Sequence, residues 1–115
     1  MILKSKYKNK KVVLDGITFD SGKESRRYSD LKLLERAKVI SELKTQVSFV
    51  LAESVRFSNE QRAKPAIKYV ADFSYIENGK LVVEDVKSEM TRKLPVYRLK
   101  KHLMKSVHNV EIKEV

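Results

Sequence analysis

Residues 66–88 read AIKYVADFSYIENGKLVVEDVKS, two apolar-rich runs on either side of the dipeptide Asn78-Gly79. Asn-Gly is typical of a two-residue type I′ turn, so the stretch predicts a β-hairpin. The length of the loop fixes the pairing register, and a two-residue loop places Asp72 opposite Asp85. Lys87 follows two residues after Asp85 and points to the same face, because side chains alternate along a strand. We therefore expect two carboxylates and one ammonium group together on one face of this hairpin.

Two carboxylates that face each other across a ladder repel, and this repulsion destabilises the pair. A divalent cation relieves it: Mg²⁺ takes oxygen ligands and is commonly held by one or two carboxylates with waters and substrate phosphates. A bound metal lowers the pKa of its water, which gives a nucleophile at neutral pH. Lys87 is placed to orient that water or to stabilise charge on an attacked phosphate. The alternative is that one aspartate is exposed near the end of the sheet and is neutralised by Lys87.

The rest of the chain predicts strands and helices around this hairpin. Asp15-Gly16 separates two short β-rich runs and indicates another hairpin, and Ser21 followed by Glu24 is a capping-box pattern that begins a helix. Pro95 suits the first turn of a second helix. The expected elements are a hairpin over 12–20, a helix over 22–37, a strand over 46–52, a loop over 53–65, the hairpin over 66–88, a helix over 95–107 and a strand over 110–113. This order predicts an α/β fold in which helices flank a mixed sheet.

The helices have distinct faces. In the first helix, Tyr28, Leu31 and Leu34 form the stripe that we expect to be buried. In the second helix, we expect an apolar stripe to pack on the sheet and basic residues to lie opposite it. The apolar stripe consists of Val96, Leu99, Leu103 and Val107, and the basic face of Arg98, Lys101 and Lys105.

Composition and charge limit the class of protein. The chain has 115 residues, no cysteine and a net charge of +10, so we expect one domain, no disulfide framework, no thiolate metal site and a cytoplasmic location. No apolar run reaches the roughly 18 residues that a membrane span needs. The basic surplus lies in residues 1–11, expected to form a flexible arm, and in residues 87–105. Such clustering predicts binding to nucleic acid phosphates. The expected DNA-binding residues are Lys8, Lys10, Lys11, Arg26, Arg27, Arg98, Lys101 and Lys105.

Asp72, followed on the next strand by Asp85-Val86-Lys87, resembles the PD-(D/E)XK nuclease signature, with Ala71 in place of the proline. The α-β-β-β-α-β order is similar to the restriction-endonuclease-like core of that superfamily. Residues 7–115 also resemble small phage-encoded proteins described as endonucleases of this type. The resemblance implies that Asp72 and Asp85 bind Mg²⁺, with Mn²⁺ able to substitute, and that Lys87 assists hydrolysis. It also implies that Glu24, as the acid of the first helix, joins them as a catalytic and metal-binding residue.

Two further residues near this constellation have two interpretations each. Glu24 either completes the capping box with Ser21 or, because it lies in line with Tyr28 and Leu31, points toward the sheet. Gln46 opens its strand and either reaches the same site or is merely exposed. Tyr97 is a possible site residue beside the basic helix face. Glu84 points to the opposite face from Asp85, so we expect a structural or surface role for it.

We therefore expect a Mg²⁺-dependent DNA endonuclease. On the resemblance, its preferred substrate is branched DNA such as a Holliday junction, in phage DNA recombination, replication or packaging in the host cytoplasm. Symmetric cutting of two strands requires a homodimer, because one chain carries one site. The alternative is a non-catalytic DNA-binding accessory protein of recombination on the same fold. A third interpretation is a regulator whose positive charge addresses an acidic protein partner.

Overall fold

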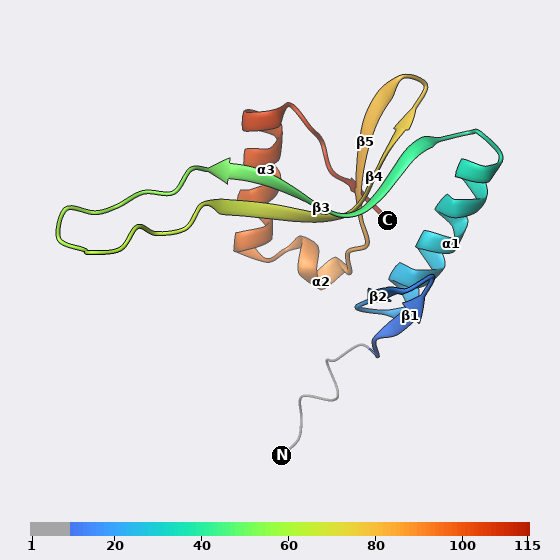
Figure 1. The fold of residues 1–115 in the computed structure, drawn as a ribbon, viewed down its shortest axis with the longest axis horizontal. Coiled ribbons are helices and arrows are strands. Elements are labelled where there is room, and N and C mark those ends of the chain that lie inside the picture. The colour runs from blue at the N-terminus through green and yellow to red at the C-terminus, as the bar shows by residue number, and fades with distance from the viewer. Residues whose placement is uncertain (1–9) are drawn as a thin grey trace, which may run out of the picture.

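The structure of the protein, a computed structural model, describes residues 10–115 (Figure 1). Lys8 and most of the basic arm expected over 1–11 lie outside the described residues. The elements are β1 (Val12–Leu14), β2 (Ile17–Phe19), α1 (Gly22–Arg36), β3 (Ser41–Ala52), β4 (Ile67–Glu77), β5 (Lys80–Asp85), α2 (Glu89–Arg92), α3 (Pro95–His108) and β6 (Lys113–Glu114). The expected order is confirmed, with the short helix α2 as an addition.

The strands form two sheets. β1 and β2 make a small hairpin around Asp15-Gly16, and the main sheet has the order β3-β4-β5-β6. Its first three strands are antiparallel, whereas β6 runs parallel to β5. The expected register of the central hairpin is confirmed, since Glu77 pairs with Lys80 and Phe73 with Glu84. The fold is therefore a mixed four-stranded sheet with helices, preceded by a hairpin.

The helices α1 and α3 cover opposite faces of the main sheet. Adjacent residues on a strand point to opposite faces, and Val82 packs in a core cluster with α1 whereas Val83 packs in a cluster with α3. The first cluster includes Tyr28 and Leu31, as the apolar stripe of α1 predicts. Figure 1 shows the two helices on either side of the strands.

The expected orientation of α3 is wrong for most of its apolar stripe. Val96 and Leu99 face outward, 66 % and 60 % exposed, and Val107 is also exposed, whereas Leu103 packs partly buried against the core. Tyr97 and Met104 are the residues of α3 that are buried against the sheet. Tyr97 and Met104 are seven residues apart and share one face, which lies about 100° around the helix from Val96. These two large side chains fill the space above Val83. Packing volume, rather than the apolar pattern, therefore sets the rotation of this helix.

Two strand boundaries also differ from the expectation. β3 begins at Ser41 rather than residue 46, because β4 supplies partners for the polar segment before it, with an irregularity between Ser41 and Lys44. The last strand covers Lys113–Glu114 rather than 110–113, and Val115 extends it by hydrogen bonds with Asp85 and Lys87. Ile112, expected within the strand, is instead buried in the core beside it. No helix within residues 10–115 is long and apolar enough to cross a membrane.

Candidate active site

The two aspartates lie at the point where β4 and β5 separate. Ladder pairing ends at Phe73 and Glu84, and the next position is held by side chains instead of backbone. The Asp72 N–H donates to Oδ1 of Asp85 at 2.7 Å, and the Val86 N–H donates to Oδ2 of Asp72 at 2.8 Å. The predicted juxtaposition of the two carboxylates is therefore present, and each carboxylate accepts a hydrogen bond from the backbone of the opposite strand.

The second carboxylate oxygen of Asp85 has no hydrogen-bond partner among the residues that the structure describes. This Oδ2 atom is buried, and the whole Asp85 side chain is fully buried. The nearest cation is Nζ of Lys87 at 3.6 Å, an ion pair too long for a hydrogen bond. Burial raises the pKa of both Asp85 and Asp72. Burying a carboxylate oxygen without a hydrogen-bond partner is energetically unfavourable. A cation bound at this Oδ2 atom would relieve that cost.

Glu24 approaches the aspartates from α1. Its backbone N–H donates to Oγ of Ser21 at 3.1 Å, which confirms the expected helix cap. Its side chain is buried, and burial together with the charges of Asp72 and Asp20 raises its pKa to about 7. The backbone of Glu24 thus belongs to the cap, while its carboxylate is a third acid beside Asp72 and Asp85.

Gln46 connects β3 to Glu24 of α1. It lies opposite Asp72, between the pairs Thr45–Phe73 and Val47–Ala71, and its φ of 53° is in the left-handed region. That conformation costs about 1–2 kcal/mol for a residue with a Cβ. Its Nε2 donates to Oε1 of Glu24 at 3.4 Å. The strain is thus located where a side chain on a strand meets the acid on the helix.

Lys87 is held between the acids and an aromatic ring. Its Nζ lies 5.0 Å from the centroid of the Tyr97 ring, a cation–π contact. The Tyr97 hydroxyl donates to the carboxylate of Glu114, which comes from β6. The structure therefore brings together Asp72, Asp85, Glu24, Lys87, Gln46 and Tyr97.

Arg27 is not available to bind phosphate, contrary to the expectation. Its guanidinium makes two hydrogen bonds with Glu84, at 2.6 and 2.8 Å, and the Tyr75 hydroxyl donates to the same carboxylate at 2.5 Å. Although burial opposes ionisation of Glu84, these donors hold its pKa below the usual value. The expected structural role of Glu84 is therefore confirmed, and Arg27 is its partner. No residue pattern in the sequence links these two positions.

The other expected DNA-binding residues within the described chain are exposed: Lys10, Lys11, Arg26, Arg98, Lys101 and Lys105. Arg26 and Lys23 line a cleft of about 450 Å³ together with Val86, the residue that follows Asp85. Lys23 was not among the expected residues, although it precedes Glu24 directly. Lys11 forms an exposed ion pair with Asp20 at 3.7 Å.

The donor set of this site suits a hard divalent cation. Within residues 10–115, no group of three or more histidine, aspartate or glutamate side chains is arranged to hold a metal ion. Mg²⁺, however, commonly needs only one or two carboxylates and completes its shell with water and phosphate. The unpartnered Oδ2 of Asp85 and the raised pKa values of the three acids fit such a cation.

Fold and site together describe a mixed α/β protein with a buried site of three acids and one lysine. The chain matches the family described as "Protein of unknown function (DUF1064)" over residues 4–114. The protein therefore belongs to this family. A comparison with curated proteins and another with solved structures found no match.

Proposed function

We propose that the protein is a metal-dependent DNA endonuclease with a restriction-endonuclease-like core of the PD-(D/E)XK type. The observation that supports this most is the buried, unpartnered Oδ2 of Asp85, which lies 3.6 Å from the Lys87 ammonium. Asp72 lies directly across the strands from it. Acids and a lysine in this arrangement suit phosphodiester hydrolysis by an activated water.

Asp72, Asp85 and Glu24 would hold Mg²⁺, with Mn²⁺ able to substitute. When bound, the ion supplies a water of lowered pKa and positive charge beside the phosphate. Lys87 orients the attacking water or stabilises the charge that develops on the phosphate. The Tyr97 ring fixes the position of the Lys87 ammonium, so Tyr97 is a positioning residue. Gln46 positions the Glu24 carboxylate.

The proposed substrate is DNA, because the chain carries a net charge of +10 and basic residues border the site. Branched DNA such as a Holliday junction is the preferred class, by the resemblance to small phage-encoded endonucleases. Cutting two strands symmetrically would require two copies of the chain.

A second function has one observation in its favour. Asp72 and Asp85 each accept a backbone N–H from the opposite strand, which is a structural task that needs no metal. On this alternative the protein is a DNA-binding accessory factor without catalysis.

Cleavage of labelled linear duplex, flap and four-way-junction DNA, with Mg²⁺ or Mn²⁺, tests the proposal. Asp85→Asn keeps the shape of the side chain and the Oδ1 acceptor but removes the charge at Oδ2. Lys87→Ala removes the ammonium. Both variants should lose activity by on the order of 100-fold or more. Lys80→Gln, an exposed lysine at the β4–β5 turn, is the matched control and should cut like the wild type.

Circular dichroism and urea unfolding would confirm that the variants are folded. Cutting restricted to the junction would support the branched-substrate class. A wild-type chain that binds DNA but cuts none of these substrates with either metal would overturn the nuclease proposal in favour of the accessory factor.

A further inference from the structure

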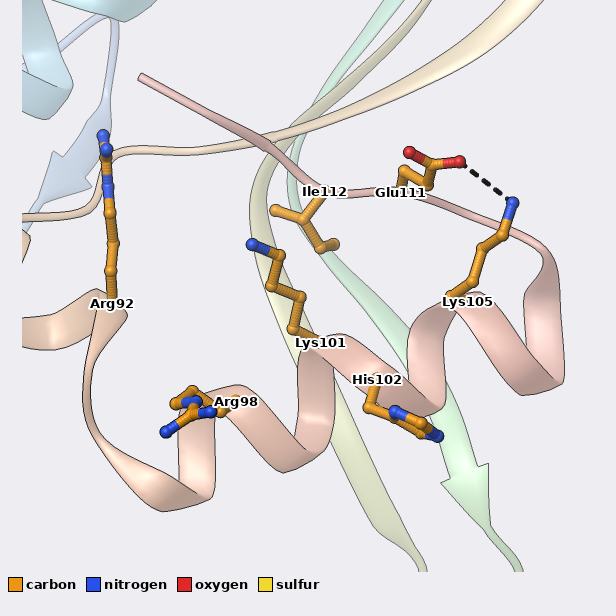
Figure 2. A pocket seen from close by; sticks show the side chains of 7 residues that line it. All are labelled: Arg92, Arg98, Lys101, His102, Lys105, Glu111 and Ile112. Carbon is orange, nitrogen blue, oxygen red and sulfur yellow. Dashed lines mark hydrogen bonds and ion pairs between the residues drawn. The ribbon is translucent and has the colours of Figure 1, made fainter.

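A second concave surface lies between α2, α3 and the segment that follows α3 (Figure 2). Its volume is about 540 Å³. Basic side chains dominate its lining, which includes Arg92, Arg98, Lys101, Lys105, Glu111 and Ile112. We call this surface the α3 pocket.

The charge of the α3 pocket follows the helix axis. Arg98, Lys101 and Lys105 lie on successive turns of α3, and a rise of about 1.5 Å per residue spreads them over roughly 10 Å. Arg92 extends the row from α2. A row of cations on a concave surface suits a chain of phosphates better than a single compact anion.

Acids of the chain itself occupy part of this row. Glu111 accepts from Nζ of Lys105 at 3.0 Å, and Glu114 accepts from Nζ of Lys101 at 3.2 Å. Glu114 also lies 3.8 Å from Arg92. The Lys105–Glu111 pair is exposed, with 79 % of the Glu111 side chain accessible, and such pairs are weak, so a phosphate can take the place of Glu111. Glu114 is only 17 % exposed and is also held by the Tyr97 hydroxyl, so it stays in place.

The α3 pocket is connected to the candidate active site. Glu114 accepts a hydrogen bond from the Tyr97 hydroxyl, and the Tyr97 ring contacts Lys87. Lys87 in turn pairs with Asp85. The pocket and the acid site therefore lie on either side of Tyr97.

We infer that the α3 pocket is a phosphate subsite for a polynucleotide strand, and that Glu111 is an internal counter-ion that a backbone phosphate displaces. The inference deepens the proposed function, on which it rests for the identity of the strand as DNA. It adds Arg92 to the contacts and assigns Glu111 the role of weakening polyanion binding. Removing a cation from the pocket should weaken binding, whereas removing a counter-ion should strengthen it.

The first experiment measures binding of a fluorescent single-stranded oligonucleotide and its duplex in EDTA over a range of salt concentrations, so that no cleavage occurs. Arg98→Gln/Lys105→Gln should lower the magnitude of the log–log salt slope by about 2, since each lost phosphate contact removes roughly 0.9 on duplex DNA. Lys38→Gln/Lys80→Gln changes the net charge equally at two exposed residues outside the pocket. This control should keep a slope near that of the wild type.

The second experiment uses Glu111→Gln, which releases Lys105 and removes an exposed acid from the pocket. Binding should tighten by about two- to fivefold, the range expected for loss of one weak ion pair. Glu53→Gln, an exposed acid in the loop after β3, is the control for the change in net charge. Equal tightening by both variants would overturn the counter-ion role.

The outcomes separate the pocket from the proposed function. If the wild type cuts DNA but the Arg98/Lys105 variant binds like its control, the pocket inference fails and the nuclease proposal stands. If the variant loses affinity but the wild type cuts no DNA, the pocket stands and the nuclease proposal fails. If polyglutamate of equal charge competes as well as the oligonucleotide, the pocket takes acidic protein instead, and its assignment to a polynucleotide is overturned.

Discussion

Glu24 is buried beside other acids, and this placement makes its ionisation unfavourable. Burial and the charges of Asp72 and Asp20 raise its pKa to about 7 from an ordinary value of 4.5. The folded chain therefore keeps a proton that the unfolded chain releases between these two pH values. This retained proton stabilises the folded state. Its contribution to the free energy of unfolding is complete below pH 4.5 and is lost as the pH rises to about 7.

Glu24→Gln imitates the protonated acid at every pH. Relative to this variant, the wild type should lose about 1–3 kcal/mol of unfolding free energy between pH 4.5 and about 7, with no further change above that. Urea unfolding at a series of pH values measures the difference. A difference that does not vary with pH would contradict the placement of Glu24. Added Mg²⁺ should stabilise the wild type more than the variant at pH 8.

At the scale of single residues, the sequence predicts which acids meet but not how they are satisfied. The two-residue turn at Asn78-Gly79 fixes the register, so the juxtaposition of Asp72 and Asp85 follows from the sequence. The hydrogen bonds from backbone N–H groups to these two carboxylates at the end of the ladder do not follow from it, because they depend on how far β4 and β5 separate. The left-handed backbone of Gln46 has no local signal either, since glutamine carries no preference for that conformation.

At the scale of elements, one buried ion pair fixes α1 on the sheet. Glu84 is fully buried on β5 and accepts from Arg27 of α1 and from Tyr75 of β4. Arg27 lies three residues after Glu24 and therefore on the same side of α1. Glu84 directly precedes Asp85. The cluster of Arg27, Glu84 and Tyr75 thus positions the helix acid relative to the strand acids.

Removal of Arg27 should be costly because it leaves a buried charge without its partner. Arg27→Met should lower the unfolding free energy by about 3–5 kcal/mol, and Tyr75→Phe by about 1.5–3 kcal/mol, the value of a hydrogen bond to a charged group. The double variant Arg27→Met/Glu84→Met should recover much of the loss, because no charge remains buried. Urea unfolding measures all three. A cost below about 1 kcal/mol for Arg27→Met alone would show that the pair does not hold α1.

The elements themselves follow from local signals more closely than their packing does. Capping by Ser21, the Asp15-Gly16 and Asn78-Gly79 turns, and Pro95 locate α1, both hairpins and the start of α3, because these signals act within a few residues. The rotation of α3 depends on which side chains fit the sheet, and Tyr97 and Met104 fit there. An apolar stripe alone therefore does not identify the packed face of an amphipathic helix.

At the scale of the whole molecule, an arm formed by the segment that connects β3 and β4, residues 53–66, extends well beyond the rest of the fold (Figure 1). The Cα radius of gyration is 16.6 Å, larger than the roughly 13 Å of a compact domain of this length. Within this arm, an isolated bridge joins Val55 to Lys64, and the Arg56 guanidinium donates to the Gln61 carbonyl oxygen at 3.2 Å. Val55 and Phe57 are each more than half exposed. The arm thus buries little apolar surface, and the loop expected over 53–65 contains no regular strand.

Shortening this arm should change the shape of the protein more than its stability. Replacing residues 56–63 with the dipeptide Asn-Gly should leave the unfolding free energy within about 1 kcal/mol, because the removed residues bury little apolar surface and a shorter loop costs less entropy to close. The radius of gyration from small-angle scattering should fall, and the far-ultraviolet circular dichroism should change little. Urea unfolding supplies the stability. A decrease of about 2 kcal/mol or more in the unfolding free energy would mean that the end of the arm packs on the rest of the chain and does not protrude from it.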